Sequence, residues 1–327
     1  QPMGFYAPDS LVHEAQLRGV GVLSLDVNAS AAQCTVEGGG VRLGLGYIKG
    51  VAEAAVTELV AERQRGGPFR TLGELAARTG ASRGTLEALA WSGACEALSG
   101  DGGRRAALWR LGTAAPGQGA GEGTQLALPL ALPQAPRLRK LGRWQQLIAD
   151  YSTSGVSLGE HAMAILRPRI EVPMLATSAQ LGRLPNGCAV AVAGLVIARQ
   201  RPSTAKGIMF LLFEDEWGTI NLIVPKATYE RNRALARAEP LLLARGRLER
   251  SEGVINVLVR ELAPLERFLS PDAGEPSQDA RVRHLPTGAE PAQLEPAAEQ
   301  QDAAAEVGAS MRAAAPPVQS FAMGRRR

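Results

Sequence analysis

A glycine turn in front of an alanine-rich helix carries the clearest chemistry in this sequence of 327 residues. The stretch GYIKGVAEAAVTELVAER, residues 46–63, places Gly50 at the turn. In a helix-hairpin-helix element, such a turn directs successive backbone N–H groups outward at the positive end of a helix, where they bind one phosphate without reading a base. We therefore expect Lys49, Gly50, Val51 and Ala52 to contact a DNA backbone phosphate. Ala52 stands where a second glycine is usual, and its methyl group is tolerable if φ stays negative.

A second, weaker copy of this pattern is SRGTLEALAWSGACEAL, with Gly93 at its turn. Two such elements in tandem would bind two phosphates across a duplex groove, and the predicted backbone contacts of this part are Arg83, Gly93, Arg104 and Arg105. Other arginines surround the two copies, at positions 63, 65, 70 and 78. The alternative is that both copies are ordinary helical turns capped by glycine.

A second group of cations lies in the β-rich half of the chain. Arg199, Arg201 and Lys206 flank an expected hairpin, and Trp217 and two phenylalanines follow. Proteins that bind single strands combine a positive groove with aromatic side chains on which bases stack. We expect single-strand contacts from these three cations and Trp217; the alternative is a solvated, charged hairpin. Because residues 210 and 213 have opposite parity in a strand, one of the two phenylalanines must belong to the core.

No other side chains suggest catalysis. The three histidines and three cysteines are scattered without a CxxC pair, so we expect no catalytic residue, no metal ligand and no cofactor in this chain. The net charge of +4 and pI near 9.2 permit an anionic partner without requiring one. The apolar runs are shorter than a membrane span and no export signal precedes them, which predicts a cytoplasmic protein with no membrane partner.

The elements that must position these residues form an α+β multidomain chain. Helical stretches with glycine-rich turns are expected before residue 110, as a tandem helix-hairpin-helix domain. After residue 187, five short strands are expected, with the helix KATYERNRALARAE between the third and fourth, which is the strand order of an OB-fold β-barrel. The tail is rich in Pro, Ala, Gln and Glu and should be disordered. The predicted segments are 1–40, helical domain 41–110, linker with short helices 111–184, barrel 185–268 and tail 269–327.

The predicted linker contains a candidate docking peptide. In QLALPL, the residues Gln125, Leu126, Leu128 and Leu130 follow the type of short motif by which bacterial proteins bind the sliding clamp. An extended segment can fold onto its partner when it binds. The alternative is that a linker rich in Ala, Leu and Pro generates such a string by chance.

Several longer stretches resemble the C-terminal part of bacterial C-family DNA polymerases, and most closely their error-prone, mutagenesis-associated branch. They include QPMGFYAPDSLVHEAQLRGVGVLSLDVNAS, VRLGLGYIKGVAEAAV and VAGLVIARQRPSTAKGIMFLLFEDEWGTINLIV, and the resemblance covers the chain from residue 1 to about residue 269. It implies that residues 1–40 end a fingers region, that residues 41–110 hold duplex DNA and that the barrel lies near the single-stranded template.

The resemblance also implies what lies elsewhere. The palm carboxylates and their Mg²⁺ would belong to a part of the polymerase upstream of Gln1, so we expect this segment alone to be inactive. Expected partners are primer-template DNA, the sliding clamp and mutagenesis proteins. One alternative is a non-enzymatic repair adaptor that uses both modules for protein contacts. Another is an RNA-binding enzyme such as a tRNA synthetase, which would share only the barrel order.

Overall fold

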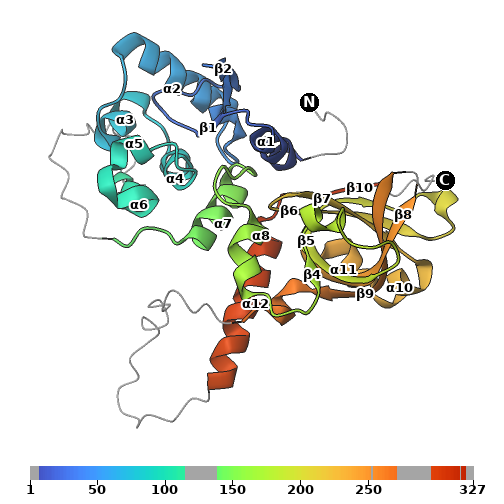
Figure 1. The fold of residues 1–327 in the computed structure, drawn as a ribbon. Coiled ribbons are helices and arrows are strands. Elements are labelled where there is room, and N and C mark those ends of the chain that lie inside the picture. Colours follow the sequence, from blue (N-terminus) through green and yellow to red (C-terminus); the bar gives the residue numbers. More distant parts are fainter. Residues whose placement is uncertain (1–6, 115–137, 252, 271–295, 317, 322–327) are drawn as a thin grey trace, which may run out of the picture. The chain divides into compact units, whose positions relative to one another are not determined.

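The computed structural model describes residues 7–114, 138–251, 253–270, 296–316 and 318–321 (Figure 1). Contacts divide the chain into two compact units. The helical unit holds residues 6–160 and 314–317, and the barrel unit holds residues 1–5, 161–313 and 318–327. None of the helices within the described ranges is long and apolar enough to cross a membrane.

The helical unit is built from short helices whose ends are set by local sequence. Thr71 caps α3 by accepting a hydrogen bond from the Glu74 amide, and Ser82 caps α4 by accepting one from the Thr85 amide. The apolar faces of these helices meet in one core. The elements are α1 (Pro8–Leu17), β1 (Val22–Leu23), β2 (Thr35–Glu37), β3 (Gly40–Arg42), η1 (Leu45–Tyr47), α2 (Glu53–Gly66), α3 (Leu72–Thr79), α4 (Arg83–Trp91), α5 (Glu96–Ser99), η2 (Gly100–Gly102), α6 (Gly103–Ala114) and α7 (Arg143–Thr153).

Helix α7, which falls within the predicted linker 111–184, is part of this unit. Tyr151 in α7 is buried, and its hydroxyl donates a hydrogen bond to Asp9 Oδ2 over 3.0 Å. The Ser157 amide donates to the other oxygen of Asp9 over 2.9 Å. The linker prediction was drawn from the Gly/Ala/Pro-rich stretch, most of which lies outside the described residues, as does the candidate clamp motif at 125–130.

The barrel has the predicted order of five strands with helices between the third and fourth. Its strands pair in the circuit β5–β6–β7–β9–β8–β5, and the β7–β9 pair is parallel. This closed arrangement confirms the OB-fold prediction. The elements are β5 (Ala189–Gln200), β6 (Met209–Asp215), β7 (Gly218–Val224), α10 (Lys226–Arg231), α11 (Arg233–Ala238), β8 (Leu241–Ser251) and β9 (Val254–Pro264). Smaller elements of this unit are α8 (Ala162–Leu166), η3 (Arg167–Arg169), β4 (Leu175–Ala176), α9 (Ser178–Leu181), η4 (Ser203–Ala205) and η5 (Leu265–Phe268).

Residues beyond the barrel include a helix, which falls within the predicted tail, 269–327. Helix α12 runs Pro296–Ala314, and the short strand β10 (Gln319–Phe321) follows it. Val307 and Met311 lie four residues apart on α12 and are both buried. The Ala- and Glu-rich composition hides this short apolar stripe, because only two large side chains form it.

Candidate nucleic-acid interface

The first glycine turn has the backbone that phosphate binding requires. Gly50 has φ +80°, a value that L side chains rarely adopt, and helix α2 begins three residues later. Ala52 is the N-cap of α2 with φ −67° and ψ 143°. The methyl group of Ala52 therefore causes no backbone strain, which meets the condition under which alanine is tolerable there.

Three amides of this turn are available to a ligand. Within the described part of the chain, the N–H groups of Gly50, Ala52 and Glu53 have no protein acceptor, and all three residues are exposed. The amide of Lys49 donates to Thr153 O over 2.7 Å, and that of Val51 points back to Ile48 O at 3.4 Å. The available amides are thus those of residues 50, 52 and 53, whereas the predicted contacts were residues 49 to 52. Orphan amides at a helix start are the groups that bind anions.

The two charged side chains beside the turn, Lys49 and Glu53, have opposite signs. Lys49 is exposed, and its Nζ donates a hydrogen bond to Tyr151 O over 2.7 Å. Partial desolvation of the ammonium group lowers the pKa of Lys49. The carboxylate of Glu53 lies in the first turn of α2, beside the available amides. A carboxylate at this position competes with a phosphate for the positive end of the helix.

The second glycine turn is filled by the protein itself. Gly93 has φ +87°, and a Cβ added there would come within 2.9 Å of Arg104 Nη2. Arg104 is only 8% exposed and pairs with Glu96 at 2.9 Å and Asp150 at 2.7 Å. The guanidinium group of Arg104 thus links α6 to α5 and α7 inside the unit, and its predicted DNA contact stays a prediction.

A cavity of about 260 Å³ lies beside the second turn. Its charged lining residues are Asp26, Glu96, Asp150 and the already paired Arg104. Three carboxylates against one arginine make this space unfavourable for a phosphate. The second copy of the pattern thus has the hairpin's backbone but lacks an open, positive surface at its turn.

The remaining arginines of the helical unit are mostly engaged. Arg83 is exposed and pairs with Glu87 one helical turn away at 2.8 Å. Arg105 donates weakly to Arg139 O and to Gln145 Oε1, at 3.4 and 3.3 Å. Three further arginines, Arg63, Arg65 and Arg78, donate to main-chain carbonyls or to glutamates. The amides of Gly50, Ala52 and Glu53, rather than a field of arginines, are therefore what this unit has available for an anion.

In the barrel, Arg199 is buried, and its predicted single-strand contact stays a prediction. It is 5% exposed, and its Nε and Nη2 donate to Ala236 O at 3.0 Å and Glu239 O at 2.6 Å. Burial lowers the pKa of its guanidinium to about 10. Arg199 ties β5 to the end of α11.

Arg201 and Lys206 stay exposed in the loop that joins β5 to β6. The guanidinium carbon of Arg201 lies 4.5 Å from the ring centre of Tyr229 on α10, a cation–π arrangement that fixes its direction. Lys206 has no ion-pair partner among the residues that the structure describes. These two cations remain candidates for phosphate contact.

Trp217 lies at the other end of β6 from this loop. It is 62% exposed in the turn between β6 and β7, and its amide donates to Asp215 Oδ1 over 3.0 Å. Asp215 is fully buried and also accepts hydrogen bonds from Ser178. At about 3.3 Å per residue, the seven residues of β6 separate Trp217 from the loop by roughly 20 Å. The cations and Trp217, close in sequence, therefore lie at opposite ends of β6.

Between these ends lies an outward face that the predicted site residues do not include. Leu211, Phe213 and Leu222 point into the core, so their neighbours on the same strands point outward. This confirms that one phenylalanine, Phe213, is core, while Phe210 faces out and is half-buried. Cross-strand pairs define the outer face as Phe210, Leu212, Asn221, Ile223, Arg247, Asn256 and Leu258. Period-two alternation read along these four strands, β6 to β9, would have found it.

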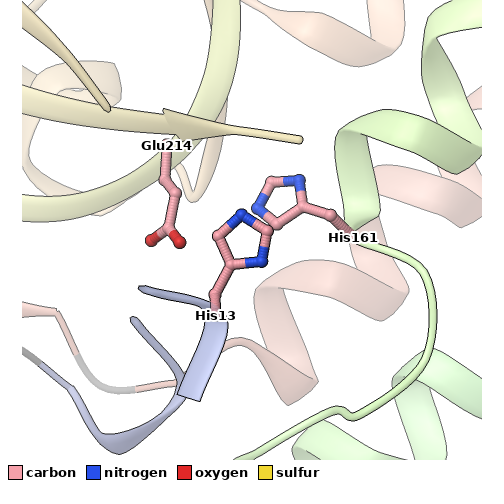
Figure 2. A group of neighbouring side chains, drawn as sticks. All are labelled: His13, His161 and Glu214. Carbon is pink, nitrogen blue, oxygen red and sulfur yellow. The ribbon is translucent and has the colours of Figure 1, made fainter. Parts of the chain in front are cut away.

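Figure 2 shows a histidine and a carboxylate of the barrel unit near each other. A ring nitrogen of His161 and a carboxylate oxygen of the buried Glu214 lie within 4.8 Å. His161 Nδ1 accepts a hydrogen bond from the Met163 amide over 3.1 Å and so caps α8. His13, which the figure also labels, belongs to the helical unit. Within the barrel unit, His161 therefore has a structural role as the N-cap of α8.

Known proteins resemble this chain in part. Residues 19–108 match the family model of the helix-hairpin-helix motif. An error-prone DNA polymerase of Anaeromyxobacter dehalogenans is 42% identical over 297 residues, which are 86% of this chain and 25% of that protein. One of Mycolicibacterium paratuberculosis is 40% identical over 269 residues, 80% of this chain and 24% of that protein. The chain thus spans about a quarter of the length of these curated relatives.

Among solved structures, the asparaginyl-tRNA synthetase from Pyrococcus horikoshii resembles 24% of this chain, and 20% of its own, at 22% identity and a TM-score of 0.21. A likeness this weak supports no functional argument.

Proposed function

We propose, from the premise that this chain is the C-terminal part of a bacterial C-family DNA polymerase of the error-prone branch, that it holds DNA for that polymerase. In this proposal the helical unit grips the backbone of primer-template duplex, and the barrel holds the single-stranded template. Nucleotidyl transfer is performed by palm carboxylates and Mg²⁺ in a part of the polymerase that this chain does not include.

The observation that carries the duplex role is the Gly50 turn. It combines a positive φ, three exposed amides without protein acceptors and the start of a 14-residue helix. It also lies inside the range that matches the helix-hairpin-helix family. A site of this kind contacts phosphate and carries no base specificity, which suits a polymerase that must hold any sequence. We propose Arg83 and Arg105 as peripheral contacts, because both reach the surface of this unit.

The single-strand role is supported by the outer face of the barrel. Phe210 offers a ring for stacking, Asn221 and Asn256 offer amide groups, and Arg201 and Arg247 are exposed cations near its borders. The half-buried carboxylate of Glu249, which pairs with Asn256 at the border of this face, is outnumbered by these cations. An apolar face with amides and cations is the composition that binds single strands without sequence preference.

The wider setting is also part of the proposal. The chain would act in the cytoplasm, in DNA repair and in synthesis across damaged template. The sliding clamp would bind the peptide at Gln125 to Leu130, which lies outside the described residues. A pull-down with purified clamp, comparing the natural peptide with a Gln125→Ala variant, tests this contact directly. Equal recovery of both variants would remove the clamp from the list of partners.

Single-strand binding is tested with the whole 327-residue chain and a fluorescent oligonucleotide. Three cations, Arg201, Lys206 and Arg247, predict a slope of log affinity against log salt of about −2 for a single strand. The double variant Arg201→Gln, Lys206→Gln should reduce this slope, while Arg233→Gln, an exposed arginine on α11, should not. Binding that does not depend on salt would contradict the role of the barrel.

One observation favours a second function, a protein adaptor in DNA repair. Glutamates neutralise Arg65, Arg78 and Arg83 around the hairpins, which weakens any DNA-directed field. An adaptor would retain protein partners after nuclease treatment and would bind neither duplex nor single strand. The two functions are therefore separated by the same DNA titration.

A further inference from the structure

The segment after residue 304 contacts the barrel in two ways. Arg312 Nη1 on α12 donates to both carboxylate oxygens of Glu239, at 3.1 and 3.0 Å, and lies 3.3 Å from Glu266 Oε2. Strand β10 then pairs in parallel with the end of β5, Gln319 opposite Ala198 and Phe321 opposite Gln200 (Figure 1). Ion pairs of Arg312 hold α12 on the barrel, and backbone pairing with β5 holds β10.

Strand β10 occupies an edge of β5 that would otherwise be open. At Leu195, β5 pairs with Glu214 of β6 on one edge and with Leu241 of β8 on the other. Strand β6 continues along its edge as far as Gln200, whereas β8 begins only at Leu241. Beyond Leu195 the β8 edge is therefore free for β10. An unpaired edge of this kind is a template for an added strand.

The ion pair of α12 reaches the same end of β5. Glu239 is 7% exposed and has Glu266 nearby as a second negative charge, so Arg312 offsets repulsion between two carboxylates. The main-chain carbonyl of Glu239 accepts the hydrogen bond from Arg199, which sits on β5 two residues before Arg201. Arg312, Glu239 and Arg199 thus form a continuous chain of contacts to the loop that carries Arg201.

We propose that residues 304–321 form a latch that fills a helix-and-strand docking site on the chain's own barrel and holds the end of β5 in position. The docking site consists of the β5 edge at Ala198–Gln200 and the carboxylates of Glu239 and Glu266. Its occupant needs an arginine at the end of a helix and an extended segment that begins seven residues later. This chain supplies both, as Arg312 and β10. The latch makes Arg312 a positioning residue for Arg201 and Lys206; this last step rests on the single-strand function proposed above.

Hydrogen exchange tests the latch without DNA. Alternate amides of a strand point to opposite edges, so at least one amide among residues 198–200 faces β10. In the full chain, Arg312→Glu should speed exchange in this segment by about tenfold, because it opens the edge locally. Arg312→Lys should give a smaller change. The control Arg267→Glu, an exposed arginine on η5, should leave the segment unchanged. Unchanged exchange in Arg312→Glu would overturn the latch.

A peptide supplied in trans tests the docking site itself. The chain shortened after residue 295 should bind a synthetic peptide of residues 296–321, and the same peptide with Arg312→Glu should bind at least about tenfold more weakly. A folded, shortened chain that does not bind the natural peptide would overturn the proposal. If the shortened chain does not fold, the exchange of the full-length variants decides.

The link to the single-strand site has its own readout. Arg312→Glu should lower the affinity of the full chain for a single-stranded oligonucleotide about threefold, and Arg267→Glu should lower it less. If the natural chain binds no single strand, the proposed function fails while exchange and peptide binding still test the latch. If it binds and Arg312→Glu binds equally well, the positioning role of Arg312 is refuted.

Discussion

Individual residues of this chain divide into those that hold the fold and those that are free to meet a ligand. Arg104 and Arg199 have the residue type of a DNA contact, but both are buried and both use their guanidinium groups within their own unit. Gly50 has no polar side chain and yet presents the open amides. Residue type alone therefore assigns DNA contacts poorly in this protein, because an arginine is equally suited to bridging internal carbonyls.

Gly50→Ala should weaken duplex binding and lower stability. The φ of +80° is costly for alanine, so the free energy of unfolding of the helical unit should fall by about 1–2 kcal/mol. Duplex affinity should fall further than stability explains, because the amides at 50–53 move. Gly84→Ala is the matched control: Gly84 is exposed in α4, an added Cβ meets nothing within 4 Å, and alanine favours the helix. Equal duplex affinity of the natural chain, Gly50→Ala and Gly84→Ala would refute the proposal that this turn binds duplex DNA.

Asp9 should make the stability of the helical unit depend on pH. Burial raises the pKa of its carboxyl group to about 6, against hydrogen bonds from Ser157 and Tyr151 that lower it. The folded state thus holds the proton more tightly than the unfolded chain. The resulting stability is fully present below about pH 4 and is lost as pH rises through about 6, by up to about 3 kcal/mol.

The variant Asp9→Asn tests this, because its amide resembles the protonated acid. The free energy of unfolding of Asp9→Asn minus that of the natural chain should rise between pH 4 and pH 7. Denaturant titrations at several pH values measure the difference. A constant difference would show that Asp9 does not titrate in this range.

At the scale of elements, the strands of the barrel decide which side chains face outward. Phe210→Ala should weaken single-strand binding by about 1–3 kcal/mol, the contribution of one stacked base. Met174→Ala is the control, since Met174 is 66% exposed on the same unit but lies outside the outer face. Both variants should keep the melting temperature close to that of the natural chain. If neither variant binds single-stranded DNA more weakly, the DNA strand does not cross this face of the barrel.

The sequence was sufficient to predict elements and strand order, but not what each side chain meets. Alternation and turn residues located the five strands and the helices between the third and fourth, because these signals are local. The pairing of Arg104 with Asp150, and of Arg312 with Glu239, joins residues 46 and 73 positions apart, and no local pattern encodes such contacts. The same reason explains why no local pattern placed α7 in the helical unit: its anchors, Asp9 and Lys49, lie more than 100 residues away.

At the scale of the whole molecule, the chain combines two modules that suit two forms of DNA. In the proposed function, the helical unit grips the backbone of duplex DNA and the barrel stacks the bases of a single strand. A polymerase needs both at a primer-template junction, where one form changes into the other. The proposed function therefore predicts a preference that neither module would produce alone.

The most direct test is a titration of the full chain with three DNAs of equal length: a primer-template junction, a blunt duplex and a single strand. The junction should bind most tightly, because two linked modules bind it together. The affinity for all three DNAs should fall by about tenfold or more between 50 and 200 mM salt, because the cations of the protein neutralise DNA phosphates and release counterions. Absent binding, or equal affinity for all three DNAs that salt does not change, would contradict the account that this chain holds DNA for a polymerase.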